Sequence, residues 1–186
     1  HSFPTRRSSD LTVAKAAHAR EALLTPIIKS YGSDTGVQVA SIGIQVHGGM
    51  GFVEETGAAQ HYRDARIAPI YEGTNGIQAI DLVGRKLRRD GGEAMKALIE
   101  DLKQIQLLAA ETSSENKFGL SACAKALSEG IETMSVATDA LLNADDKNAL
   151  SVAMPYLNLC ASVISGAFLI KSVLNGANAG DELTAS

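Results

Sequence analysis

The chain has 186 residues, 45% of them hydrophobic, and a formal net charge of −4 at pH 7. A chain of this length can form one or two domains and bury a substantial core. The net acidity and the dispersed Lys and Arg residues argue against a nucleic-acid partner, which needs a clustered basic stripe. The most apolar stretch, residues 157–174, is interrupted by Asn158, several serines and Lys171. We therefore expect a buried helix there and no membrane association.

The first eleven residues, HSFPTRRSSDL, match the translation of a common sequencing-library adapter at every position. They lack the apolar segment of a secretory signal. We expect residues 1–10 to be a disordered assembly artefact fused to a truncated reading frame. A natural disordered tail is the alternative, although it does not explain the match.

Residues 11–31 repeat apolar and small side chains at helical spacing, with Pro26 inside as a kink. Gly32 predicts a stop, and the following Ser and Asp predict the start of a second helix over residues 35–47. A group of glycines at positions 48, 49 and 51 ends that helix.

The next segments also read as helices. Residues 56–70 predict a short helix followed by a turn at Pro69, and residues 75–90 predict a longer helix. A glycine pair, Gly91 and Gly92, follows. No long β-alternation occurs, so we expect an all-α fold.

Beyond the glycine pair, apolar side chains recur every three or four residues in three long stripes, which predicts an antiparallel helical bundle. We therefore expect two domains, at 11–91 and 92–186. The stripes are Met95, Leu98, Leu102, Ile105, Ala109; Leu120, Ala124, Leu127, Ile131, Met134, Thr138, Leu141; and Leu150, Met154, Leu157, Ala161, Ile164, Phe168.

The two cysteines, Cys123 and Cys160, form no metal or disulfide pattern. We expect both to be buried thiols in a reducing, cytoplasmic setting.

Two charged clusters have structural interpretations. Arg63, Asp64 and Arg66 suggest an ion-pair network that fixes a turn. The run RKLRR, residues 85–89, lies in the last turn of a predicted helix, where cations stabilise the helix C-terminus. A phosphate grip is the less favoured reading. No histidine has a partner at metal-ligand spacing, so no metal site is expected.

The segment QVHGGMGF, residues 45–52, offers glycines whose backbone N–H groups can approach an anion closely. Taken alone, this pattern is weak evidence for an anion site, and a glycine helix cap with a tight turn is the favoured interpretation.

Glu72 stands between Tyr71 and a Gly-Thr pair, directly before a helical pattern. It could be a helix cap, a solvated loop residue or a catalytic base. Local features favour the cap or loop role. However, Ile70 and Ile77 give it an apolar setting, and removing water from a carboxylate strengthens it as a base near neutral pH.

Taken in order, residues 45–78 resemble the C-terminal signature of the flavin-dependent acyl-CoA dehydrogenases. The matching blocks are Q-x-x-G-G-x-G-F, R-D, I-Y-E-G-T and I-Q, at the family's spacing. The resemblance covers about residues 11–90 and implies the final helical bundle of that fold. From about residue 93 the chain resembles the extra helical domain of a longer subgroup, which includes enzymes acting on 3-methylmercaptopropionyl-CoA.

The resemblance implies roles for seven residues. Glu72 corresponds to the base that removes the α-proton of an acyl-CoA thioester while a hydride passes to FAD. Its backbone N–H would help to hold the thioester carbonyl oxygen. The resemblance also implies that Tyr71 and Gly73 border the substrate, that Thr74 contacts the flavin, and that FAD of a neighbouring subunit meets Gln45, Gly48 and Gly49.

The resemblance further implies electron-transfer flavoprotein as a partner and a homo-oligomer as the assembly. Gly76 departs from the family, where many members carry a flavin-contacting Gln. Without the β-barrel that holds most of the flavin, we expect the fragment to be inactive. The alternative is a stand-alone helical interaction module without catalytic activity.

Overall fold

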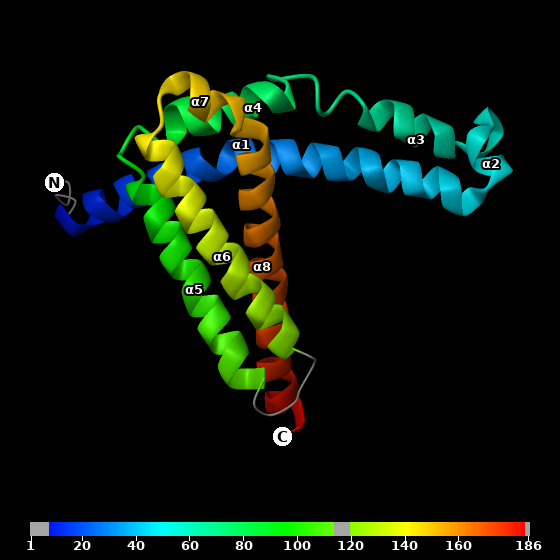
Figure 1. Cartoon of the computed structure of the whole chain (residues 1–186). Coiled ribbons are helices and arrows are strands. Elements are labelled where there is room, and N and C mark those ends of the chain that lie inside the picture. The colour runs from blue at the N-terminus through cyan, green and yellow to red at the C-terminus, as the bar shows by residue number, and fades with distance from the viewer. Residues whose placement is uncertain (1–7, 114–119, 185–186) are drawn as a thin grey trace, which may run out of the picture.

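The computed structural model describes residues 8–113 and 120–184, and every regular element in that part of the chain is helical (Figure 1). The predicted all-α class is confirmed. The elements are α1 (Ser8–His47), α2 (Gly49–Phe52), the 3₁₀ helix η1 (Glu54–Thr56), α3 (Ala58–Ala65), α4 (Asn75–Asp81), the π-helical segment η2 (Leu82–Lys86), α5 (Glu93–Ser113), α6 (Leu120–Asn143), α7 (Asp146–Ser151) and α8 (Ala153–Thr184).

α1 is one helix of 40 residues where the sequence predicted two, so the predicted break at Gly32 is wrong. The expected capping side chains, Ser33 and Asp34, instead bind the amide of Asn75 in α4. Because tertiary contacts use these groups, the helix continues past them. α1 begins at Ser8, so the last four of the eleven adapter-like residues are helical, while 1–7 lie outside the described residues. The adapter origin stays a prediction.

The C-terminal half of α1 and the shorter α3 run side by side as an arm that extends beyond the rest of the molecule, with α2 at its tip (Figure 1). Arg63 of α3 donates two hydrogen bonds to Glu54, at 2.9 and 2.7 Å. This contact lowers the pKa of the Glu54 carboxyl. The predicted ion pairing is therefore confirmed for Arg63, whereas Asp64 and Arg66 are exposed without an ion pair to any described residue.

α5, α6 and α8 form a three-helix bundle below α1 (Figure 1). The predicted stripes of α5 and α6 are buried throughout. The third stripe is wrong at its ends, because Leu150 belongs to the separate helix α7 and Phe168 is half-exposed. The buried face of α8 comprises Ala153, Tyr156, Leu157, Cys160, Ala161, Val163, Ile164, Ala167, Ile170 and Leu174.

One continuous apolar core joins α1 to the bundle. Leu23 and Ile27 of α1, together with Leu82 and Val83 of η2, belong to the same cluster as the bundle interior. The two helical halves thus share a core. The proposed division at residue 91 stays a prediction.

The two cysteines differ in exposure. Cys160 is buried as expected, whereas Cys123 is exposed and corrects that expectation. α8 is long and apolar enough over Ala153–Gly176 to cross a membrane by length and composition alone. That test is also passed by core helices, and one side of α8 packs against α5 and α6.

Candidate functional site

The loop between α3 and α4 carries the predicted catalytic segment. Glu72 has a backbone φ of 53° and is the one non-glycine residue with positive φ among those described. Gly73 follows with a φ of 86°. The N–H of Asn75 donates to the Pro69 carbonyl oxygen at 3.1 Å and closes the loop. Two consecutive residues with positive φ make a sharp turn, and the Glu72 side chain on it is exposed.

The start of α4 is built by neighbouring side chains. Thr74 is the N-cap, and its Oγ1 accepts from the Ile77 N–H at 3.3 Å. Gln78 Nε2 donates to the carbonyl oxygens of Glu72 and Gly73 at 3.2 and 3.4 Å. Glu72 is therefore not the helix cap. A hydroxyl that accepts as Thr74 does still has a hydrogen to donate.

The loop is fixed to α1 from behind. Lys29 Nζ donates to the Gly73 carbonyl oxygen at 2.8 Å and to Asn75 Oδ1 at 3.0 Å. Asn75 is buried and donates through Nδ2 to Asp34 Oδ1 at 2.8 Å. Sequence reasoning missed Lys29 and Asn75, since 46 residues separate them in the chain.

The outer side of the loop is open. Glu72 is exposed, as are the large side chains Ile70, Tyr71 and Ile77. The apolar neighbours predicted for Glu72 are present, but within the described chain nothing encloses them. A Cβ added at Gly76 would meet only Thr74 Oγ1, at 3.9 Å, so the position has room for a larger side chain.

The glycine turn lies at the tip of the arm. Gly48 has a φ of 61°, and its N–H donates to the Gln45 carbonyl oxygen at 3.1 Å. A Cβ on Gly51 would lie 2.3 Å from the Ile44 carbonyl oxygen, so α2 packs here only with glycine. A Cβ on Gly49 would meet nothing within 4 Å. The turn thus explains Gly48 and Gly51 structurally, but it does not require glycine at position 49.

The structure does not bring the two groups of predicted site residues together. Ser33 of α1 lies beside Asn75. Gly48 lies about 22 Å from Ser33 along the helix axis, at a rise of 1.5 Å per residue. Gln45, Gly48 and Gly49 therefore form one surface, and Tyr71, Glu72, Gly73 and Thr74 form another. Within the described residues no group of three or more His, Cys, Asp and Glu side chains could hold a metal ion.

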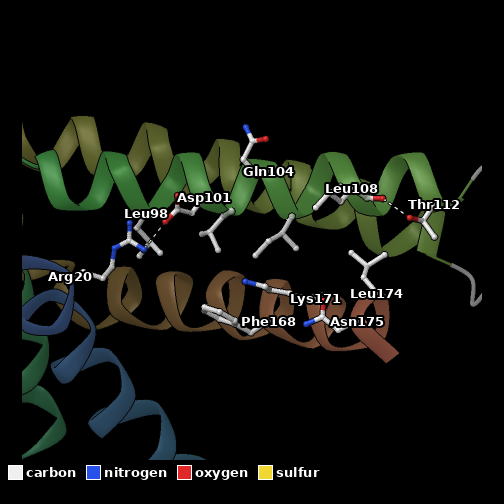
Figure 2. A pocket seen from close by; sticks show the side chains of 12 residues that line it. Arg20, Leu98, Asp101, Gln104, Leu108, Thr112, Phe168, Lys171, Leu174 and Asn175 are labelled. Atoms are coloured by element: carbon white, nitrogen blue, oxygen red, sulfur yellow. Dashed lines mark hydrogen bonds and ion pairs between the residues drawn. The ribbon is translucent and has the colours of Figure 1, made fainter. Parts of the chain in front are cut away.

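A further hollow lies away from both surfaces. A groove of about 490 Å³ runs between α5 and α8 (Figure 2). Arg20 of α1 pairs with Asp101 at 2.8 Å at one end of it, and Thr112 lies at the other. None of the predicted site residues lines this groove.

Comparison with known proteins finds similarity to one family in the first half of the chain. Residues 7–87 match the family described as acyl-CoA dehydrogenase, C-terminal domain. The human mitochondrial short-chain specific acyl-CoA dehydrogenase is 40% identical over 84 residues, covering 45% of this chain and 20% of the human protein.

Two relatives extend the similarity into the second half. The 3-methylmercaptopropionyl-CoA dehydrogenase of Ruegeria pomeroyi is 41% identical over 155 residues, which cover 81% of this chain and 25% of that protein. Acyl-CoA dehydrogenase family member 11 of Caenorhabditis elegans is 31% identical over 151 residues, covering 80% and 24%. The chain thus spans about a quarter of the length of these two relatives.

Proposed function

We propose that the chain contributes the catalytic base to an α,β-dehydrogenation of an acyl-CoA thioester, because residues 7–87 match the C-terminal domain of the acyl-CoA dehydrogenase family. Glu72 takes the α-proton. Bound FAD supplies the acceptor for the hydride that leaves the β-carbon. The left-handed turn at Glu72 and Gly73 is the observation that carries this proposal, since it presents a carboxylate at an open apolar surface.

The backbone at Glu72 supports a second role. Within the described residues its N–H has no hydrogen-bond acceptor. A thioester carbonyl oxygen placed there would accept this bond, and the bond would strengthen as negative charge develops on the oxygen. Tyr71 and Gly73 would border the acyl group, Tyr71 through its half-exposed ring.

The residues present fit a flavin in two places. Thr74 lies beside Glu72 and has a hydroxyl hydrogen to donate. Gly48 and Gly49, with the exposed Gln45, form a surface on which a pyrophosphate could meet the backbone closely, and a side chain at position 49 would fill that space. Since the two places lie far apart on one chain, they would serve flavins bound to different subunits.

The arm supports a homo-oligomer. Five of its large apolar side chains are exposed to water in the single chain, and exposed apolar surface of this kind is typical of an interface. They are Val39, Ile42, Val46, Met50 and Phe52.

We propose an acyl-CoA substrate, electron-transfer flavoprotein as the electron acceptor and a cytoplasmic location. The first thioester to assay is 3-methylmercaptopropionyl-CoA, the substrate named for the Ruegeria relative.

The test uses the complete protein that contains this segment. Glu72→Gln keeps the size of the side chain and removes its basicity. We expect the variant to purify with bound flavin and to show no bleaching of the flavin absorbance when acyl-CoA is added anaerobically. Bleaching at the wild-type rate would refute the role of Glu72. A complete protein that binds no flavin at all would instead favour the helical interaction module.

A further inference from the structure

The backbone conformation at Glu72 requires an explanation from its surroundings. A side chain at positive φ is unfavourable, and such a residue persists only where other contacts enforce it. The Asn75 N–H bond to Pro69 and the two bonds from Gln78 Nε2 hold the turn from within the loop and α4. Side chains that bind the loop from α1 add to them.

Lys29 provides the first such contact. Its ammonium group is half-buried and donates to the carbonyl oxygen of Gly73 at 2.8 Å. A charged donor makes a stronger hydrogen bond than a neutral one. Within the described residues Lys29 forms no ion pair with a carboxylate, so its charge is directed at the loop carbonyl and at Asn75 Oδ1.

Asn75 provides the second. Its Oδ1 faces the Lys29 ammonium, and its Nδ2 donates to Asp34 Oδ1 at 2.8 Å and to the Ser30 carbonyl oxygen at 3.2 Å. A cation on the oxygen side and a carboxylate on the nitrogen side fix the orientation of the amide. Asn75 therefore couples the loop to two turns of α1.

From this juxtaposition we infer that Lys29 and Asn75 form a clamp. The clamp holds residues 71–75 in the conformation that directs the Glu72 carboxylate toward the α-proton of the thioester. The inference rests on the proposed function of Glu72. Both side chains bind the backbone or each other, so they are positioning residues. Loss of the clamp would let Glu72 relax to negative φ and turn its carboxylate away.

The clamp can be measured in this chain by hydrogen exchange. The N–H groups of Tyr71 and Asn75 donate within the loop, to Ile67 and Pro69. Lys29→Met should accelerate their exchange by about ten-fold or more, the factor for losing one charge-assisted hydrogen bond. Lys29→Arg, which keeps a donor, should restore part of the protection. Lys15→Met, an exposed lysine on the same helix, is the control and should change nothing.

The amides of α6 serve as an internal reference. Acceleration confined to the loop supports the clamp, whereas unchanged exchange in Lys29→Met, or equal acceleration throughout the chain, overturns it. Asn75→Leu keeps the approximate size of the side chain but removes both the oxygen that faces Lys29 and the nitrogen that donates to Asp34. It should loosen the loop as Lys29→Met does, while the exposed Asn158→Leu should not. A tight loop in Asn75→Leu would also overturn the clamp.

The catalytic consequence is measured in the complete protein. Lys29→Met should lower kcat by up to about 100-fold, the cost of misplacing a reacting group by about 1 Å. KM should stay nearly unchanged, because the thioester does not contact Lys29. A loosened loop with wild-type kcat overturns the positioning role. A wild-type enzyme without activity, whose loop exchange still depends on Lys29, refutes the proposed function and with it the catalytic meaning of the clamp.

Discussion

The guanidinium group of Arg88 donates to the backbone carbonyl oxygen of Ala144 at 2.8 Å, across 56 residues of sequence. It also donates to the Leu141 carbonyl oxygen at 3.2 Å and pairs with Asp146. The last carbonyl oxygens of a helix have no partners within it. Arg88 therefore caps α6 and connects it to the segment that follows the candidate site.

Replacing Arg88 with Met should destabilise the chain by about 1–3 kcal/mol, the cost of losing hydrogen bonds to a charged donor in a partly buried site. Urea unfolding followed by circular dichroism measures this loss. Arg89→Met is the matched control, since Arg89 is exposed, and it should stay within about 0.5 kcal/mol of the wild type. Equal stability of both variants would contradict the capping role.

The two thiols should differ sharply in reactivity. Cys123 is exposed, whereas burial raises the pKa of the Cys160 thiol to about 12. Since the thiolate is the reactive form, a thiol reagent at pH 8 should modify one cysteine per chain promptly. The second should react only in urea. Cys123→Ser should abolish the prompt reaction, and prompt labelling of that variant would show that Cys160 is accessible.

The bundle should lose stability in alkali. Burial raises the pKa of Tyr156, whose hydroxyl lies 2.7 Å from that of Thr138, and burial also raises the pKa of Cys160 to about 12. An unfolded chain releases these protons near pH 8.5 and 10, so above those values the unfolded state binds fewer protons and stability falls.

For Cys160 the loss should reach on the order of 1–2 kcal/mol by pH 10. Urea titrations between pH 7.5 and 10.5 measure it. Comparing Cys160→Ala with the wild type isolates the thiol, since the variant should keep its stability up to about pH 10, where the tyrosine begins to contribute. The same slope in both proteins between pH 8.5 and 10 would contradict the assignment.

The glycine turn offers a matched pair of substitutions. Gly51→Ala should displace α2, because the added Cβ would lie 2.3 Å from the Ile44 carbonyl oxygen. Gly49→Ala meets no atom within 4 Å and should leave the melting temperature of this chain unchanged. In the complete protein, Gly49→Ala should lower the flavin content on purification. Full flavin retention would remove Gly49 from the proposed cofactor surface.

Much of the fold could be predicted because helical periodicity is a local signal. The buried stripes of α5 and α6 follow from spacing alone, as does the end of α1 at the glycines. The break expected at Gly32 was wrong because the capping ability of Ser33 and Asp34 is spent on Asn75, a tertiary contact. The charge run at 85–89 was expected to stabilise the C-terminus of its own helix, and Arg85 and Lys86 do lie in the last turn of η2, whereas Arg88 caps α6.

The candidate site could be predicted only in part. The motif located Glu72, but periodicity gives no information about backbone φ, and the left-handed turn was not foreseen. Lys29 and Asn75 carry no motif in the local sequence, because each gains its role from the other across the fold. A polar residue directly after a capping Thr, such as Asn75, is the one local signal that could have raised attention.

The central claim is that Glu72 removes the α-proton of an acyl-CoA thioester. The most direct measurement is the exchange of α-hydrogen for deuterium when the complete protein and a saturated acyl-CoA are incubated anaerobically in D₂O, followed by mass spectrometry. We predict that the wild type incorporates deuterium at the α-carbon and that Glu72→Gln, with its flavin retained, does not. Equal incorporation by the two proteins would contradict the account.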